Sequence, residues 1–215
     1  MDLFFSLALQ ILYGIANLAL ISLGLAIVFG MMRVINLAHG EFIMLGGYTV
    51  VVATNNGVNL WFAMLILAPL VVGLIGLIVE RCLIQWLYGR MIDTLLATWG
   101  LSLLFIGIIT SIFGASTSTV VSPPLGTVTI GEYTSSGYEL FLIFVVIVLL
   151  ALVYLTLKFT SLGLVARATM QNSDMSACLG ISTSKIYMVT FSLGAAVSGL
   201  AGGLLAPITG VLPNI

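Results

Sequence analysis

The side chains most capable of chemistry in this chain lie within nine residues, in the stretch RVINLAHGE. Arg33, Asn36, His39 and Glu41 supply a guanidinium, an amide, an imidazole and a carboxylate, which could line a polar pathway. The sequence has one histidine, so no second imidazole is available to complete a haem site. Neither an H-E-x-x-H nor a G-x-S-x-G motif occurs. We therefore expect no catalytic residue, no metal site and no cofactor.

The composition places this stretch in lipid rather than in water. Hydrophobic residues make up 61% of the chain and charged residues 6%, whereas a soluble domain carries about 25% charged residues. Several apolar runs approach the roughly 20 residues that a helix needs to cross a bilayer. We conclude that the protein is integral to a membrane, and no basic patch indicates a nucleic-acid partner.

The hydropathy pattern predicts an all-α polytopic membrane protein with about six hydrophobic segments. They are Leu3–Met32, Phe42–Ala53, Phe62–Val79, Thr94–Gly114, Leu140–Leu157 and Met188–Ala206. No linker separates them into two units, so residues 1–215 are expected to form a single transmembrane domain.

The basic residues predict how these segments are oriented. All six lie on alternate connections: Arg33, Arg81, Arg90, Lys158, Arg167 and Lys185. Because cytoplasmic loops carry the excess of Lys and Arg, we expect the N-terminus outside and the basic loops in the cytoplasm. Cys82 and Cys178 then lie in a reducing compartment as free thiols.

The second hydrophobic segment is too short to cross a bilayer by itself. Phe42–Ala53 would be about 18 Å long as a helix, against a hydrocarbon core of about 30 Å. To span, it must begin near Val34, which draws Asn36, His39 and Glu41 into the membrane. Ionisable groups at that depth usually face a protein interior or a wet cavity.

Two interpretations of this segment remain open. In the first, a broken helix lies beside a polar pathway, since irregular backbone in a bilayer must be covered by protein or line a cavity. In the second, residues 33–41 mark the cytoplasmic edge and a short tilted span follows.

The loop Lys158–Tyr187 is the longest of the basic connections. Its residues favour a helix from Leu164 to Leu179, with Gly180 as the stop signal. Ala166, Met170, Ser173 and Ala177 would form a small-residue face suited to a groove on a partner. A solvated linker is the alternative.

Two further stretches indicate local structure rather than chemistry. The loop Ala115–Glu139 is rich in Ser, Thr, Gly and β-branched residues and is long enough for a short hairpin or a plug. In the last segment, Ala195, Gly199 and Gly203 recur at a spacing that lets helices pack closely in lipid.

Three stretches resemble a known family. NLAHGEFIMLGGY, DTLLATWGLSLLF and TSLGLVARATMQNSDMSACLGISTSKI are similar to the permease subunits of bacterial ABC importers for branched-chain amino acids and urea. The third looks like that family's cytoplasmic coupling loop, which docks on an ATPase. The positions that match are Arg167, Ala168, Ala177, Gly180 and Ile181.

The resemblance implies partners and roles. A second, homologous permease subunit, cytoplasmic ABC ATPases and an external substrate-binding protein would complete the importer in the inner membrane. ATP would bind the ATPase, because this chain has no G-x-x-x-x-G-K-[ST] loop. We expect Arg167, Asp174 and Gly180 at the coupling surface.

The same resemblance implies a pathway through the membrane. We expect Asn36, His39 and Glu41 to line or gate it, with Thr98 and Trp99 behind them.

The substrate and the extent of the chain are less well defined by the sequence. Branched-chain amino acids and urea or short amides both fit the matching stretches. The runner-up function is a stand-alone channel or secondary transporter for small polar solutes, which would need no ATPase. Family members continue beyond the equivalent of Ile215, so we expect the domain to be incomplete at its C-terminus.

Overall fold

The computed structural model describes residues 2–121, 123, 125–130 and 133–213. Helices dominate it, and one β-hairpin is present. The helical elements are α1 (Asp2–Met32), α2 (His39–Asn55), α3 (Leu60–Phe62), η1 (Ala63–Leu67), α4 (Ala68–Cys82), η2 (Ile84–Leu87), α5 (Met91–Phe113), α6 (Gly137–Phe159), α7 (Ser161–Gln171), α8 (Ser173–Cys178) and α9 (Thr183–Thr209). The strands are β1 (Thr127–Ile130) and β2 (Tyr133–Ser136), which pair antiparallel and confirm the predicted hairpin.

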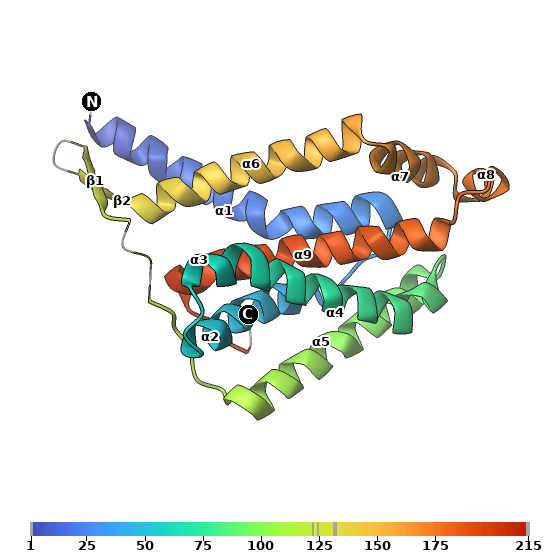
Figure 1. The fold of residues 1–215 in the computed structure, drawn as a ribbon, viewed down its shortest axis with the longest axis horizontal. Coiled ribbons are helices and arrows are strands. Elements are labelled where there is room, and N and C mark those ends of the chain that lie inside the picture. The colour runs from blue at the N-terminus through green and yellow to red at the C-terminus, as the bar shows by residue number, and fades with distance from the viewer. Residues whose placement is uncertain (1, 122, 124, 131–132, 214–215) are drawn as a thin grey trace.

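The six predicted hydrophobic segments are all helical, which confirms the all-α membrane fold (Figure 1). Within the described residues, five helices are long and apolar enough to cross a membrane: α1, the continuous helix Leu60–Cys82, α5, α6 and α9. The sixth segment is α2, which has 17 residues and is about 25 Å long. Residues 63–67 form a π-helical turn inside the third span.

Helix α9 is the centre of the bundle and packs against α1, α2 and α4 (Figure 1). It is more buried than any other span described. Its sequence explains why, because FSLGAAVSGLAGGLLA offers small residues on every side. Lipid tails are as apolar as leucine, so close van der Waals packing of small residues is what holds membrane helices together.

The contact between α2 and α9 depends on glycine. A Cβ added at Gly202 would lie 1.8 Å from the Ile43 carbonyl oxygen, and one added at Gly46 would lie 2.1 Å from the Gly199 carbonyl oxygen. The two backbones therefore touch directly. The prediction that the glycines of the last segment serve helix packing is confirmed.

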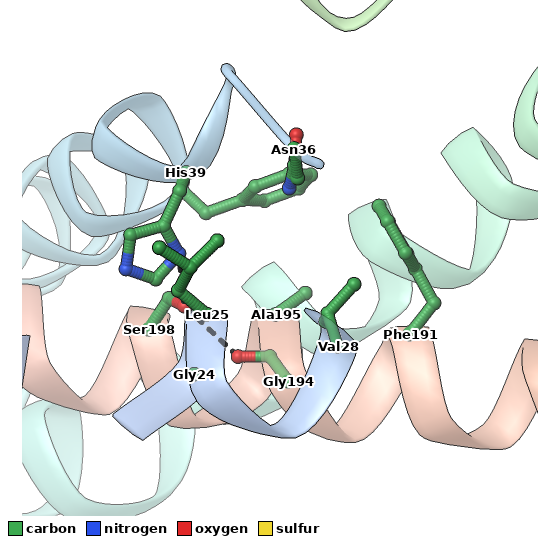
Figure 2. A pocket seen from close by; sticks show the side chains of 10 residues that line it. Gly24, Leu25, Val28, Asn36, His39, Phe191, Gly194, Ala195 and Ser198 are labelled. Atoms are coloured by element: carbon green, nitrogen blue, oxygen red, sulfur yellow. Dashed lines mark hydrogen bonds between the residues drawn. The ribbon is translucent and has the colours of Figure 1, made fainter. Parts of the chain in front are cut away.

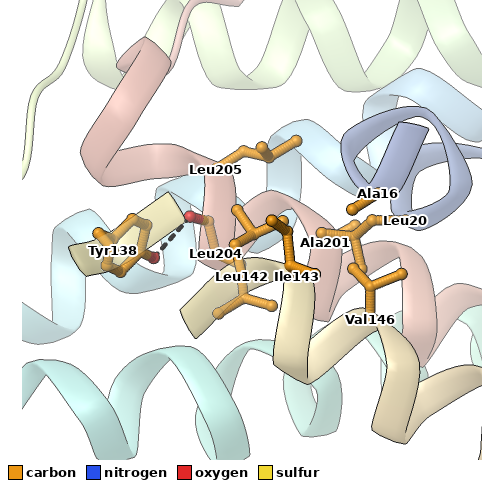
Figure 3. Packing of buried hydrophobic residues seen from close by; sticks show 9 residues of the cluster. All are labelled: Ala16, Leu20, Tyr138, Leu142, Ile143, Val146, Ala201, Leu204 and Leu205. Carbon is orange, nitrogen blue, oxygen red and sulfur yellow. Dashed lines mark hydrogen bonds between the residues drawn. The ribbon is translucent and has the colours of Figure 1, made fainter. Parts of the chain in front are cut away.

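On another side of α9, an apolar cluster joins α1, α6 and α9 (Figure 3). Leu20, Leu142 and Leu204 are completely buried there. The Tyr138 hydroxyl donates to the Leu204 carbonyl at 2.7 Å, which ties the start of α6 to α9. This cluster fixes α1 and α9 next to each other over much of their length.

Residues 33–38 are irregular and separate α1 from α2, and α2 itself is one unbroken helix that begins at His39 rather than near Val34. Arg33 adopts a left-handed conformation with φ 52°, which turns the chain away from the end of α1. The imidazole of His39 lies 2.8 Å from the Ile21 carbonyl, and Ile21 precedes Met32 by eleven residues. Helix α2 therefore begins about 16 Å from the C-terminal end of α1, measured along the axis of α1, at a depth where α1 is within the membrane.

The bundle has two distinct ends. At one end lie α7, α8, the 83–90 turn and all six basic residues, and we refer to it as the basic end (Figure 1). At the other lie the first turns of α1 and the β-hairpin, and we refer to it as the hairpin end.

Candidate functional site

The break before α2 places Asn36 and His39 between α1 and α9 (Figure 2). Asn36 is buried, and its side-chain oxygen accepts the Ala38 N–H at 3.1 Å. His39 Nε2 donates to the Ile21 carbonyl at 2.8 Å, since a carbonyl can only accept. Its Nδ1 then faces the Ser198 hydroxyl at 3.3 Å. His39 thus bridges three helices through one ring.

Glu41 faces a different neighbour. It is 7% exposed, and its Oε1 accepts the Ser102 hydroxyl of α5 at 2.6 Å. The other oxygen, Oε2, is buried and has no hydrogen-bond partner in the part of the chain that the structure describes. The structure therefore brings Glu41 to α5, away from the α1–α9 contact that His39 occupies.

Of the two residues expected behind this group, only Thr98 lies there. Thr98 is completely buried, and its hydroxyl accepts the Leu37 N–H at 3.2 Å, which covers the irregular backbone of the break. Trp99 is 55% exposed on another side of α5. Successive residues on a helix point about 100° apart, so both side chains cannot face the same neighbour.

Two hollows meet at His39. Towards the hairpin end, a cavity of about 480 Å³ lies between α1, α2 and α9. We call it the wide cavity, and its walls include Asn17, Ile21, Gly40, Leu205 and Thr209. On the other side of His39 is the central crevice, bounded by Gly24, Val28, Asn36, Phe191 and Ser198, which has no room for a water molecule (Figure 2).

The loop expected to couple to an ATPase folds as two helices rather than one. The predicted helix from Leu164 to Leu179 is wrong, because Asn172 leaves the helical conformation with φ −154° and ψ 102°. Its side-chain oxygen accepts the Met175 N–H at 3.0 Å and caps α8. Helix α7 also starts earlier than predicted, at Ser161, with Thr160 as its N-cap. Gly180 follows α8 with φ 83°, a left-handed conformation, which confirms the prediction that this glycine ends the helix.

The side chains expected at the coupling surface point outwards for the most part. Arg167, Ala168, Asp174, Ala177 and Gly180 are exposed, and Ile181 is half-buried. Ala166 and Ser176 are buried instead, so they are the inner face of the α7–α8 pair.

Beneath α7 and α8 lies a third hollow of about 280 Å³, the basic-end cavity. Arg33 shares its lining with Thr169, Gln171, Asn172 and Tyr187.

Two buried polar residues were missed from the sequence, Ser198 beside His39 and Glu80 at the end of α4. Ser198 contacts His39 and also donates to the Gly194 carbonyl at 2.9 Å. The one feature of the sequence that could have indicated this role is that Ser198 is a polar residue within a run of small apolar residues. Glu80 is buried at the end of α4, where the Tyr88 hydroxyl donates to its carboxylate. In the described part of the chain, no three His, Cys, Asp or Glu side chains gather as metal ligands would.

Comparison with known proteins identifies the family and the relatives that the chain resembles in sequence. The family described as "branched-chain amino acid transport system / permease component" matches residues 7–215. The permease protein LivH of the high-affinity branched-chain amino acid transport system of Escherichia coli K12 is 26% identical over 211 residues, covering 90% of this chain and 68% of LivH.

Two other similar proteins are also permeases of branched-chain amino acid transport systems. BraD, a permease protein of the same kind of system in Pseudomonas aeruginosa, is 29% identical over 209 residues, covering 90% of this chain and 68% of BraD. A probable LivH from Methanocaldococcus jannaschii is 28% identical over 210 residues, covering 91% of this chain and 64% of that protein. No solved structure matches the chain.

Proposed function

We propose that this chain, which belongs to the family of permease components of branched-chain amino acid transport systems, moves its solute across the inner membrane by using ATP that a partner subunit hydrolyses. The chain itself is a multi-pass membrane protein and a transport subunit. The match over residues 7–215 carries the permease part of the proposal. ATP coupling, the partner subunits and the orientation in the membrane are the further parts of the proposal, and features of the structure support each of them.

The α7–α8 pair supports coupling to a partner protein. It connects two spans, α6 and α9, and it carries large apolar side chains that are exposed: Leu162, Leu164, Met175 and Leu179 are each more than 60% accessible. Arg167 and Asp174 stand among them, also exposed. A surface of this kind, apolar with one charge of each sign, is suited to a protein partner rather than to water alone.

The arrangement of charge supports the orientation proposed from the sequence. All six basic residues gather at one end of the bundle, together with α7 and α8. By the positive-inside rule this end is cytoplasmic, where an ABC ATPase can reach it. An external binding protein would then approach the hairpin end, and a second, homologous permease subunit would cover exposed spans such as α5.

Branched-chain amino acids are the substrate that the site supports best. The wide cavity has apolar walls with a few polar atoms, which is the usual lining of a small-molecule site. An aliphatic side chain fits such walls, whereas urea would leave them without contacts. No cofactor is needed in this chain, because the nucleotide belongs to the ATPase.

The test is to co-purify the protein with its second permease, ATPase and binding protein, and to measure ATP hydrolysis. We expect leucine-loaded binding protein to stimulate hydrolysis and urea to have no effect. Combining Arg167→Ala with Asp174→Ala should abolish the stimulation and release the ATPase. Arg90→Ala is the matched control, because Arg90 is exposed at the same end and its ion pair among the described residues is a surface contact with Asp93 at 3.7 Å. Stimulation by urea alone would overturn the substrate, and unaltered coupling in the double variant would overturn the role of the loop.

A further inference from the structure

A fourth hollow lies on the side of the bundle, between α6 and the α1–α9 pair. In the half near the hairpin end, α6 packs against α1 and α9 through the cluster that includes Leu20, Leu142 and Leu204 (Figure 3). In the half near the basic end, α6 diverges from α1, and a groove of about 360 Å³ lies between them (Figure 1). We call it the lateral groove. The first turns of α7 line its basic end.

The lining of the lateral groove offers nothing to a polar solute. Among the side chains that line it, those with a nitrogen or oxygen atom are Thr156, Thr160 and Thr190. Each hydroxyl already donates to a carbonyl of its own helix, that of Val153 at 2.9 Å, of Thr156 at 2.5 Å and of Ile186 at 2.8 Å. A charged or strongly polar ligand would lose its hydration there without compensation. The groove is therefore suited to a hydrocarbon chain.

The lateral groove is as long as one leaflet of the membrane is thick. It runs along residues 149–160 of α6 and residues 186–197 of α9. Eleven steps of 1.5 Å give about 16 Å on either wall, and half of a hydrocarbon core of about 30 Å is about 15 Å. Leu152, Leu162 and Leu193 in its lining are each more than half exposed, so the groove is open to the surrounding lipid.

The lateral groove ends beside a hollow of the opposite character. Met31 lines both the groove and the basic-end cavity, so the two adjoin. Polar residues line the cavity, including Gln171 and Asn172, and Arg33 brings a positive charge to it. Arg33 is exposed and makes no ion pair with any residue that the structure describes. An apolar groove one leaflet long and a polar cavity with an unpaired cation together match an anionic amphiphile.

We propose that the lateral groove binds one acyl chain of an anionic phospholipid from the leaflet at the basic end, with the phosphate of the headgroup at Arg33 in the basic-end cavity. Basic pockets between transmembrane helices recognise anionic headgroups in this way. The charge of this end is complementary, since six basic residues face three acidic ones, Glu80, Asp93 and Asp174, which leaves a net charge of +3. The inference goes beyond the transport function and depends on neither substrate nor ATP.

A lipid in this place contacts α7 along its whole length. Gly163 and Ala166 in the first half of α7 line the lateral groove, and Thr169 and Gln171 in the second half line the basic-end cavity. The acyl chain would fill the space between α7 and the α1–α9 pair, while the headgroup would hold the end of α7 near Arg33. The bound lipid thus fixes the position of the helix that begins the coupling loop.

A helix of a neighbouring subunit is the other apolar occupant to consider. With its side chains a helix is about 10–12 Å across, so a 16 Å length of helix fills on the order of 1,300 Å³. That is several times the volume of the lateral groove. A helix also carries no obligatory negative charge for Arg33. Volume and charge together favour the lipid.

The test measures the phospholipid that the protein retains when it is co-purified with its partner subunits. The complex is reconstituted in vesicles of equal parts phosphatidylglycerol and phosphatidylethanolamine, extracted in a mild detergent and washed. The bound phospholipids are then quantified by mass spectrometry. We expect the wild type to retain phosphatidylglycerol in preference to phosphatidylethanolamine. Equal retention of the two lipids overturns the anionic headgroup.

A substitution that fills the lateral groove tests the place. Leu193→Trp introduces an indole from α9, and we expect the retained phosphatidylglycerol to be lost. Leu155→Trp is the matched control, because Leu155 is 52% exposed, against 54% for Leu193, but does not line the groove. Val189→Trp, on the same wall, replaces Leu193→Trp if that variant is not monodisperse. Unchanged retention in the folded variant overturns the proposal, and loss of a partner subunit in place of lipid identifies a helix-docking surface instead.

A second substitution tests the charge. Arg33→Asn removes the guanidinium, and asparagine tolerates the left-handed conformation that Arg33 adopts, with φ 52°. We expect the retained ratio of phosphatidylglycerol to phosphatidylethanolamine to fall about fivefold, the factor that one basic side chain corresponds to near an anionic surface. Arg81→Asn is the control, since Arg81 is exposed at the same end and lines neither hollow. Equal ratios in the two variants overturn the role of Arg33. Because no substrate or ATP is added, failure of the lipid site and failure of the transport function are distinguished.

Discussion

The close contact between α2 and α9 makes a sharp prediction about one methyl group. In Gly202→Ala the new Cβ would lie 1.8 Å from the Ile43 carbonyl oxygen and 2.7 Å from its carbon. Both atoms are backbone, so no side chain can rotate away. To restore ordinary contact at about 3.4 Å, the helices must separate by roughly 1.5 Å, which also loses the dispersion contacts along their length.

We expect Gly202→Ala to destabilise the protein by about 3 kcal/mol, at the upper end of the usual cost of overpacking. For a chain of this size that corresponds to a fall in Tm of about 9 °C. The assay is thermal unfolding of the purified protein in detergent, followed by loss of the monodisperse species. The control is Gly107→Ala on α5, where an added Cβ meets nothing within 4 Å. Equal Tm values for the two variants would refute the direct backbone contact of α2 with α9.

Three further predictions concern hydrogen bonds. Ser102→Ala leaves the buried Glu41 carboxylate without its donor, so we expect a loss of about 1–3 kcal/mol in thermal unfolding, and an unchanged Tm would show that the bond contributes nothing. Burial first, and then the hydrogen bond to Glu80, raises the pKa of Tyr88 above its ordinary value of 10.0. The stabilisation that the protonated Tyr88 hydroxyl contributes to the folded state is therefore fully present below about pH 10 and is lost as the pH rises beyond it. Wild type should lose Tm above that pH relative to Tyr88→Phe, and parallel curves would contradict the buried pair. Asn172→Ala removes the α8 cap at a cost of about 1 kcal/mol and should weaken ATPase binding in co-purification, whereas retention at wild-type level would show that the cap does not shape the surface.

The sequence predicted those features that depend on hydropathy and length. Six apolar segments predicted the five helices that are long enough to span and the shorter α2, and the polar stretch Arg33–Glu41 predicted the irregular connection that the structure places at residues 33–38. The clustering of basic residues at one end also followed, because alternate connections of a helical bundle meet at the same end. Each of these is a local property of the chain, which is why it could be predicted without a partner.

The contacts that build the site depend on residues far apart in the sequence. Ser198 reaches His39 across 159 positions, and Ser102 reaches Glu41 across 61. No periodicity in either segment identifies the partner. Some errors were avoidable, since Asn172 followed by Ser and Asp is a typical N-cap signal.

The most direct test of the central claim is uptake into proteoliposomes that contain this protein with its second permease and ATPase. Labelled leucine and labelled urea are each supplied outside together with the binding protein, and ATP is supplied to the ATPase face. We predict saturable leucine uptake that requires ATP and is lost with an inactive ATPase, and no uptake of urea above background. Leucine uptake that continues without ATP would contradict the account and favour a channel or secondary transporter.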